Sequence, residues 1–222
     1  MLIRPRPGLW RPDEFRPRTD CFIHNGAAAA SNLRVIWDSA TMTAGAFTLT
    51  NSNLTAERTT ADSGAGRMIV SSRRHSAGAW YCEITVNNIG DGGADFGIGV
   101  SQTGSPNEIP GANSVTWGYR PNGNKYFNGG NAAYGDTYTT NDVIMVAFNA
   151  NTGKIWFGKN GTWQASGDPG AGSNEAYSGL SGSLGAAFGG RYSGGAQAKV
   201  TANFGASAFS YTVPSGFSPG WR

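Results

Sequence analysis

The side chains that could perform acid–base chemistry are few and far apart in this sequence. Glycoside cleavage needs two carboxyl groups, about 5 Å apart for retention and further apart for inversion. On a β-strand this requires Asp or Glu two or four residues apart, because alternate side chains share a face. Glu83 and Asp142 each stand alone in or beside an expected strand. A glycan-cleaving sandwich enzyme is therefore the least favoured of the functions considered.

Nucleophilic chemistry is equally short of partners. The only histidines are His24 and His75, and neither a nucleophile elbow before a helix nor a phosphate-binding loop is present. Cys82 lies inside an expected strand, where a thiol packs rather than reacts. Cys21 lies far from it, so two free thiols are favoured over a disulfide, which stays open. The sequence predicts a non-enzymatic protein without a cofactor.

Four aspartates in glycine-rich loops are the only candidates for metal ligands. Their carboxylates could supply oxygen atoms to calcium, but aspartate is also a common turn former, which is the favoured interpretation. The four are Asp91, Asp95, Asp136 and Asp168. No Cys/His cluster with zinc spacing accompanies them, and we expect no metal site.

Aromatic and arginine side chains at strand ends and in loops are the remaining chemical signal. Tyr, Trp and Arg are the residue types that binding surfaces favour, and Tyr and Trp rings can also stack on sugars. Some of these side chains are expected to cap the edges of the core instead. The leading ligand-binding candidates are Arg73, Arg74, Tyr119, Arg120 and Tyr126.

The composition indicates an all-β domain that carries a basic leader. The 222 residues include 34 glycines, and short β-rich segments alternate with Gly, Asn, Ser and Thr clusters. Residues 1–34 hold six arginines against three acidic residues, whereas the remaining residues hold 11 basic and 11 acidic side chains. Because nucleic-acid binding needs a basic face, the balanced body makes nucleic acid an unlikely partner.

The stretch 139–164 is expected to organise the sheet that positions these side chains. An apolar run at 143–148, a loop closed by Gly153 and a second run at 154–158 form a hairpin. Asn160-Gly161 then fits a type I′ turn, because both central residues of that turn need positive φ. The first run is apolar almost throughout, which predicts a central strand covered on both faces.

Further strands are expected on both sides of this hairpin. Residues 79–86 alternate apolar and polar side chains with a period of two, while 129–138 and 165–178 are expected to be loops. The other expected strands are 33–37, 47–50, 54–59, 67–72, 95–101, 115–120, 125–128, 183–188 and 198–204.

Several of these blocks together resemble the SPRY (B30.2) family. The central element is the Asp-led apolar strand followed by Ile155-Trp156-Phe157 and Lys159-Asn160-Gly161. Other matching blocks, in order, are 47–54, 80–83, 96–100, 118–120, 125–126 and 203–205, with Phe209, Tyr211 and Pro214. The resemblance spans residues 33–217, with Asn141 standing where glycine is usual and Asn149-Ala150-Asn151 where acidic residues are often found. It implies an antiparallel, concanavalin-like β-sandwich that binds peptides or proteins through loops at one end.

The first 20 residues are expected to form an extended arm. They contain five arginines and four prolines with interleaved aromatic residues, a composition that favours polyproline II over helix or central strand. The proposed docking residues are Arg4, Arg6, Trp10, Phe15 and Phe22. We therefore divide the chain into a docking arm and linker at 1–32, the sandwich at 33–218 and a tail at 219–222.

These expectations combine into a functional hypothesis. The glycine-rich, low-charge sequence, with residues 159–164 and 166–169, is similar to SPRY domains in bacteriophage structural proteins. We expect a virion component, assembled in the host cytoplasm in multiple copies, whose residues 1–32 bind other virion structural proteins. The sandwich would face outward towards a host-surface protein or glycan, with no membrane insertion because no long apolar run is present. The alternative is a free adaptor or lectin-like module.

Overall fold

The computed structural model describes residues 34–61, 66–90, 96–102, 108–192 and 194–222. Its chain divides into two units, Met1–Asn32 and Leu33–Arg222. The docking residues proposed within positions 1–32, together with Cys21, lie outside the described residues. All the strands of the described chain belong to the second unit.

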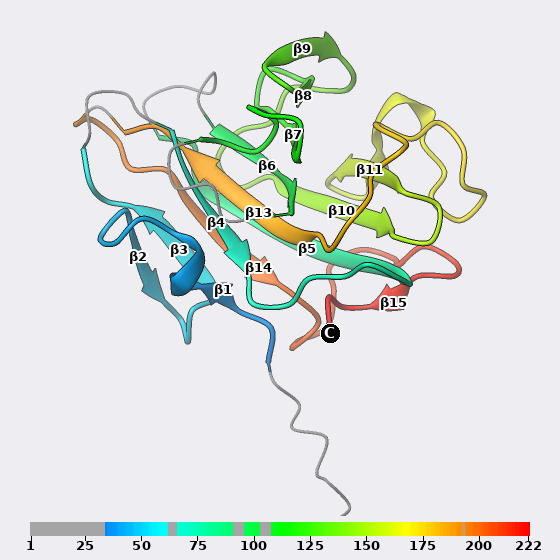
Figure 1. Ribbon diagram of the computed structural model, residues 1–222, viewed down its shortest axis with the longest axis horizontal. Helices are drawn as coiled ribbons and strands as arrows, with labels where there is room; N and C mark the ends of the chain where they lie inside the picture. Colours follow the sequence, from blue (N-terminus) through cyan, green and yellow to red (C-terminus); the bar gives the residue numbers. More distant parts are fainter. Residues whose placement is uncertain (1–33, 62–65, 91–95, 103–107, 193) are drawn as a thin grey trace, which may run out of the picture. The chain divides into compact units, whose positions relative to one another are not determined.

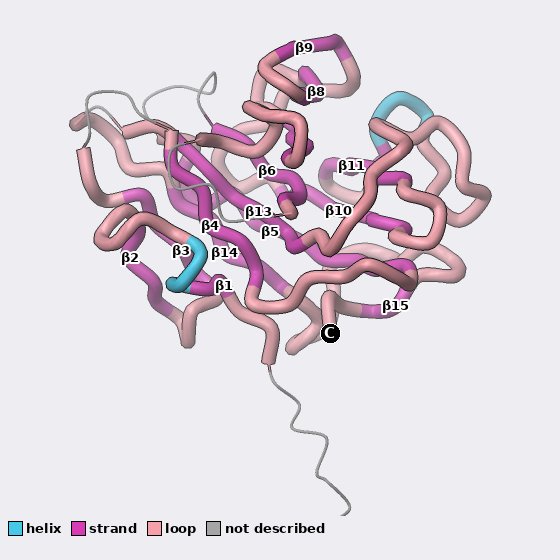
Figure 2. The backbone as a smooth tube through the Cα atoms, in the orientation of Figure 1, coloured by secondary structure: helices cyan, strands magenta, loops and turns pink. Residues whose placement is uncertain are grey.

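Two antiparallel sheets packed face to face make up this unit (Figures 1 and 2). We call them sheet A and sheet B. Sheet A has the order β1 (Trp37–Asp38), β4 (Arg67–Ser71), β13 (Gly185–Gly190), β6 (Phe96–Ser101), β7 (Thr116–Tyr119), β8 (Asn124–Phe127) and β9 (Gly130–Ala133). Sheet B has the order β12 (Thr162–Trp163), β11 (Lys154–Lys159), β10 (Val143–Asn149), β5 (Ala79–Asn88), β14 (Lys199–Asn203), β3 (Thr55–Arg58) and β2 (Phe47–Thr50).

The remaining elements are small. β15 (Ser218–Pro219) pairs with β5 in parallel, and two 3-10 turns are formed by η2 (Ser39–Thr41) and η4 (Gln164–Ser166). No helix in the described part of the chain has the length and apolar character needed to cross a bilayer. The predicted all-β antiparallel sandwich is confirmed.

The expected central hairpin forms β10 and β11. β10 lies between β5 and β11, and its middle residues are buried on both faces. Asn160 and Gly161 have φ values of 48° and 90°, as a type I′ turn requires. The Asn160 side chain fixes the turn, because its Oδ1 accepts from the Val143 N–H at 2.8 Å and its amide donates to Asp142 at 2.6 Å.

The core fills the space between the sheets with alternate side chains of each strand. Sheet B contributes Ile144, Val146 and Phe148 from β10, all fully or nearly fully buried. Phe188 of sheet A lies 6.4 Å from Trp37 and 5.2 Å from Phe96, measured between ring centroids. Such tilted aromatic contacts add to the burial of large apolar rings.

The outer face of sheet A is shaped by glycines. Residues Ile109 and Pro110 lie across this face, over Gly66, Gly97, Gly118 and Gly189. A Cβ at Gly118 would lie 2.3 Å from the Pro110 carbonyl oxygen, and one at Gly189 would lie 2.7 Å from the Pro110 ring. We call these four glycines the glycine stripe; it lets a loop backbone pack directly on the sheet.

The outer face of sheet B has two unlike halves. On β2, β3, β14 and β5, a row of paired threonines runs from Thr50 through Thr55 and Thr201 to Thr85. Thr201 shares a 2.8 Å hydrogen bond with Thr55 and donates one of 2.7 Å to Asn87. On β5, β10 and β11 the same face carries aromatic and apolar side chains, which the C-terminal segment covers.

Two sequence-based assignments were wrong. Residues 219–222 are not a tail, because Pro219 belongs to β15 and Trp221 is fully buried in the core, where its backbone N–H donates to the Phe204 carbonyl at 3.0 Å. Residues 129–138 are not only a loop, because β9 pairs with β8 across Asn128-Gly129. Both residues of that turn have positive φ, 49° and 77°, so a second Asn-Gly turn makes this hairpin.

Candidate functional site

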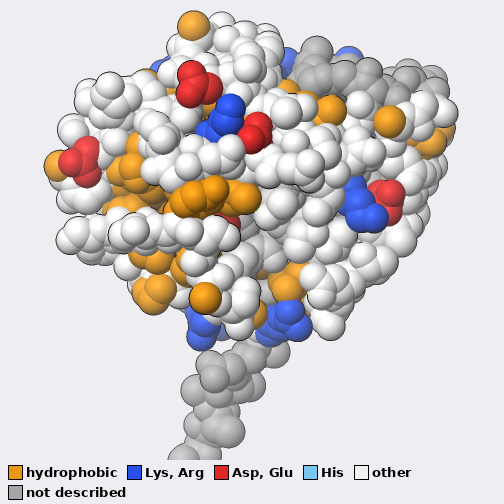
Figure 3. Space-filling view, turned by 180° about the vertical axis from the view of Figure 1, so that it is seen from behind, with side chains coloured by type: hydrophobic (Ala, Val, Ile, Leu, Met, Phe, Trp, Pro, Cys, Tyr) orange, Lys and Arg blue, Asp and Glu red, His pale blue; other side chains and the backbone are white. Residues whose placement is uncertain are grey.

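A groove opens on the aromatic half of the outer face of sheet B. It has a volume of about 420 Å³ and is lined by Met145, Gly161, Trp163 and residues 168–170 and 210–215. Figure 3, which views the molecule from behind, shows hydrophobic side chains gathered around a hollowed region on this side. We call it the aromatic groove; its volume lies in the range typical of ligand sites.

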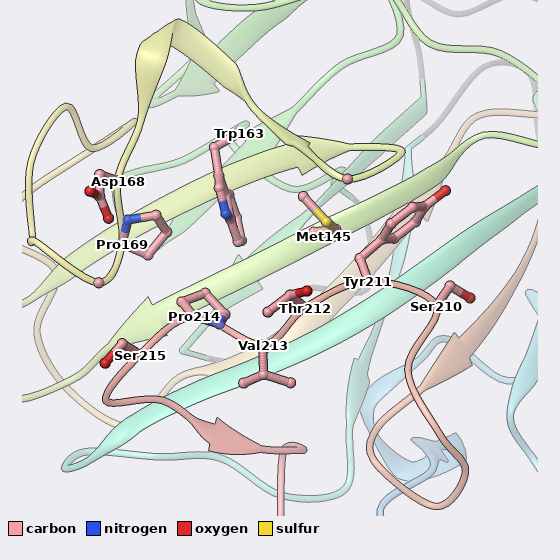
Figure 4. Close-up of a pocket in the computed structure, with 12 residues that line it drawn as sticks. Met145, Trp163, Asp168, Pro169, Ser210, Tyr211, Thr212, Val213, Pro214 and Ser215 are labelled. Carbon is pink, nitrogen blue, oxygen red and sulfur yellow. The ribbon is translucent and has the colours of Figure 1, made fainter.

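Trp163 is the main side chain of one wall. The Asn160-Gly161 turn places it on the two-residue strand β12 at the sheet edge, where it stays half-buried. Its ring contacts Tyr81 edge-to-face at 6.3 Å, and Figure 4 shows it projecting into the groove between Pro169 and Met145. Within the described residues the indole N–H has no hydrogen-bond partner, so it remains available to a ligand.

The opposite wall is the segment 210–215, which Glu83 holds in place. The Glu83 carboxylate is 3% exposed and accepts the backbone N–H of Ser210 at 2.9 Å and of Tyr211 at 2.8 Å. It also accepts the Tyr81 hydroxyl at 2.9 Å. Burial, and then the charge of Glu83, raise the pKa of Tyr81 well above its ordinary value. A buried carboxylate needs such donors, so this geometry gives Glu83 a structural role.

Aromatic contacts complete this wall. Phe209 packs edge-to-face on Tyr81 at 4.9 Å, and Phe217 packs on Trp156 at 6.1 Å. The Tyr211 ring lies over Gly161, where an added Cβ would approach it to 2.9 Å. The C-terminal segment thus crosses the sheet on aromatic side chains, and the groove lies between this segment, Trp163 and residues 168–170.

The rim supplies polar groups. Asp168 is exposed; its Oδ1 accepts the Ala171 N–H at 3.0 Å, and its second oxygen has no partner in the described chain. The hydroxyls of Ser210, Thr212 and Ser215 are also exposed. Together with apolar Met145, these groups give the groove both apolar and polar contacts for a ligand.

Tyr119, a predicted ligand-binding residue, is not on the surface. It is fully buried, stacks on Phe157 at 5.6 Å and donates its hydroxyl to the Asp136 carbonyl. Burial raises the pKa of its phenol above the ordinary value. The prediction was wrong because alternation along β7 turns Tyr119, like Trp117, towards the core.

Arg120 and Tyr126 contact each other instead of forming an open binding surface. The Arg120 guanidinium lies 3.5 Å from the centre of the Tyr126 ring, and its Nη1 donates to Asn131 Oδ1 at 3.3 Å. Arg120 is only 9% exposed. We call Arg120, Tyr126 and Asn131 the arginine corner; its cation is already engaged by groups of the same domain.

Arg73 and Arg74 lie elsewhere on sheet A. Val70 of β4 shares a cross-sheet row with Tyr126 of β8, and four strand spacings place the two about 19 Å apart. Arg73 and Arg74 extend beyond β4 in one direction along the strands, while Arg120 extends beyond β7 in the other. The structure therefore does not gather the five predicted residues into one site.

His75 and Cys82 are packing residues in this structure. His75 is 8% exposed and stacks on Trp80 at 3.7 Å, with Trp221 at 5.8 Å. Loss of hydration lowers the pKa of its imidazole, and Arg73 adds to this. Cys82 is fully buried, and burial raises the pKa of its thiol. A protonated, inaccessible thiol is not a nucleophile.

No metal centre is seen in the part of the chain that the structure describes. Within it, no three His, Cys, Asp or Glu side chains converge. Asp168 instead closes a turn on Ala171, as predicted for a loop aspartate. Asp91 and Asp95 lie outside the described residues.

The sequence analysis did not single out the groove residues. Trp163 was not among the predicted ligand-binding residues, Tyr211 was named only as a position that resembles the family, and Glu83 only as an isolated carboxylate. One usable signal existed: a Trp two residues after an Asn-Gly turn is expected on the returning strand of the hairpin, and at a sheet edge part of its ring meets solvent. The pairing of Glu83 with Ser210, 127 residues away, has no local signal.

Comparison with known proteins supports one family. The SPRY domain model matches residues 79–205. Among solved structures, the SPRY domain of human HERC1 is similar with a TM-score of 0.60 and 20% identity, covering 75% of this chain and 96% of that one. A second human SPRY domain is similar with a TM-score of 0.56 and 20% identity, covering 73% and 98%. No curated protein matches the sequence.

Proposed function

Since the chain belongs to the SPRY domain family, whose members are generally protein-binding modules, we propose that its aromatic groove binds an extended peptide of a partner protein. The observation that carries this proposal is the half-buried Trp163, whose indole N–H has no hydrogen-bond partner among the described residues. Binding without reaction is the activity that this groove supports.

The groove has the anatomy of a peptide site. Apolar side chains of Met145, Pro169 and Val213 line it, while the Asp168 carboxylate and three hydroxyls surround it. An extended peptide offers backbone carbonyls to the Trp163 donor and side chains to the apolar floor, which is how peptide grooves combine affinity with specificity. The hydrogen bonds from Ser210 and Tyr211 to Glu83 hold the wall formed by residues 210–215 in place before a ligand arrives, which lowers the entropic cost of binding.

We also propose that residues 1–32 attach the protein to a larger particle, a bacteriophage virion assembled in the host cytoplasm, in several copies. The support is the sequence: arginines, prolines and aromatic residues are concentrated there, whereas the rest of the chain is balanced in charge. Aromatic residues in an extended arm gain free energy by burial against another protein. A host-surface protein or glycan is then the partner of the displayed sandwich.

The groove proposal is tested by presenting the full chain to an array of random extended peptides. Tyr211→Ala removes an aromatic wall and should weaken every bound peptide at least about tenfold, as truncation of an anchor does. Tyr126→Ala, at the arginine corner, is the matched control and should bind as the unaltered protein does. Equal loss in both variants, or binding that survives Tyr211→Ala, would contradict the proposal. A glycan array run in parallel tests the lectin-like alternative.

A further inference from the structure

We propose that the ligand of the aromatic groove is the arginine- and proline-rich segment 4–18 of a second copy of this chain. This inference rests on the proposed peptide-binding function and names its partner. It makes the protein self-associating: the arm of one copy occupies the groove of the next.

The groove matches the chemistry of a polyproline II helix. Such a helix has no internal hydrogen bonds, so its carbonyls need outside donors, and its proline rings pack against aromatic side chains. Trp163 supplies an unpartnered donor within the described chain, and Trp163 and Tyr211 stand on opposite walls with Pro169 and Pro214 beside them (Figure 4). Because the helix is already extended before binding, little ordering entropy is lost.

Charge complementarity favours arginine beside the prolines. Asp168 stands on the rim with one carboxylate oxygen unpartnered within the described chain. The other acidic groups near the β10–β12 hairpin are engaged: Lys159 lies 3.8 Å from Asp142, and Lys154 lies 3.2 Å from Glu175. A guanidinium next to a bound proline would therefore find one open carboxylate at this groove.

The chain itself carries a segment with this chemistry. Between residues 4 and 18, each of the four prolines directly follows an arginine: Arg4-Pro5, Arg6-Pro7, Arg11-Pro12 and Arg16-Pro17. The segment has five arginines against Asp13 and Glu14, whereas residues 35–222 hold equal numbers of basic and acidic side chains. Its positive charge is therefore the one uncompensated charge of the sequence.

The arm is long enough to reach a neighbour. Fifteen residues in polyproline II span about 46 Å, and residues 19–32 add further linker. A folded unit of 190 residues has a radius of gyration of about 16 Å, so the segment can extend beyond its own domain. Arm-to-groove contacts between copies give a closed pair when two copies exchange arms, and rings or chains when the contacts run head-to-tail.

The test measures binding of a labelled peptide of residues 3–19 to the full chain. Trp163→Phe keeps a ring but removes the donor, and it should weaken binding about fivefold, the value of one hydrogen bond. Asp168→Asn keeps the Ala171 turn but removes the charge; it should weaken binding about threefold at low salt, and the difference should vanish at high salt. Glu57→Gln, on the threonine half of the same face, is the matched control and should bind unchanged.

Self-association is measured on the same proteins by sedimentation velocity over a range of concentrations. The full chain should form concentration-dependent oligomers, free peptide should dissociate them, and replacing Pro5, Pro7, Pro12 and Pro17 by alanine should weaken them although the charge is kept. A peptide of scrambled sequence should compete poorly. Equal competition by the scrambled peptide, or unchanged affinity in both Trp163→Phe and Asp168→Asn, would overturn the proposal.

The array described above separates this inference from the function on which it rests. Suppose that unrelated peptides bind, that Tyr211→Ala abolishes their binding, and that the 3–19 peptide does not bind. The groove is then a peptide site with another partner, and the self-association proposal is wrong. If no peptide binds, both proposals are wrong. Because Asp168 is exposed, its variant is expected to fold even if Trp163→Phe does not.

Discussion

The aromatic groove and the arginine corner are built from the same kinds of residue but differ in how those residues are engaged. At the corner, Arg120 rests on Tyr126 at 3.5 Å and bonds to Asn131. At the groove, the described structure offers no partner to the Trp163 indole N–H or to the second oxygen of Asp168. The corner uses its binding chemistry to hold three neighbouring strands together, while the groove leaves it open to solvent.

Residue type alone therefore does not identify a binding surface. Cation–π and hydrogen-bonding groups stabilise the fold when the topology brings them together, and they bind ligands when it keeps them apart. In sheet A, adjacent strands bring Arg120 and Tyr126 into contact. In sheet B, a segment from the end of the chain crosses the face and contacts the β11–β12 turn through Tyr211, and the groove lies between this segment, Trp163 and residues 168–170.

The largest loss of stability and of peptide binding is expected from Glu83→Gln. The glutamine amide keeps one carbonyl oxygen but places its NH2 group against the N–H of either Ser210 or Tyr211, so the wall of the groove would lose one of its two anchoring hydrogen bonds. We expect the free energy of unfolding to fall by about 2–3 kcal/mol, together with peptide binding. Urea denaturation measures the first quantity. Glu57→Gln should change the free energy of unfolding by less than about 0.5 kcal/mol. A similar loss of stability in Glu83→Gln and Glu57→Gln would contradict the special structural role of Glu83 beneath the groove wall.

A smaller effect is expected from Arg120→Met, which keeps a long apolar side chain but removes the cation. The loss of the Tyr126 and Asn131 contacts should lower the free energy of unfolding by about 1–2 kcal/mol. Peptide binding at the groove should not change, because the corner lies on the other sheet. Stability by urea denaturation and affinity by fluorescence anisotropy are the two measurements. Reduced affinity without reduced stability would show that the corner is a binding surface after all.

The smallest effect is a pH dependence from His75. Burial lowers its pKa below the ordinary 6.5, so the folded state binds fewer protons than the unfolded state between these two values. Stability is therefore full above pH 6.5 and falls as the pH drops towards the folded pKa, by at most about 1.4 kcal/mol per pH unit. His75→Gln should flatten this slope in urea denaturation between pH 7.5 and 5. An unchanged slope would assign the pH dependence to other groups.

Local chemistry was enough to predict much of the fold. The Asn160-Gly161 turn and the apolar run before it predicted β10–β12, and the period-two pattern predicted β5. The Asn128-Gly129 turn gave the same signal, but the polar, glycine-rich strand after it was interpreted as a loop. The inward direction of Tyr119 follows from the alternation that also buries Trp117, so this error was avoidable.

Of the two walls of the groove, only the one that contains Trp163 had a local signal in the sequence. One wall depends on hydrogen bonds between Glu83 and residues 127 and 128 positions later, and neither end of that contact has a local signature. Trp221 is similar, because its position near the chain end suggested a tail although its ring completes the core. Long-range contacts decide both features, and periodicity does not encode them.

The glycine stripe has a consequence for experiments that map function by mutational tolerance. Gly118 and Gly189 contact no groove residue, yet a methyl group there would strike Pro110 and lift the loop from the sheet. A saturation scan scored by folding or activity would mark these positions as intolerant, while the exposed Asp168 would accept most substitutions in a folding screen. Such a map would point to the face opposite the groove, so only a scan scored by ligand capture would locate the site.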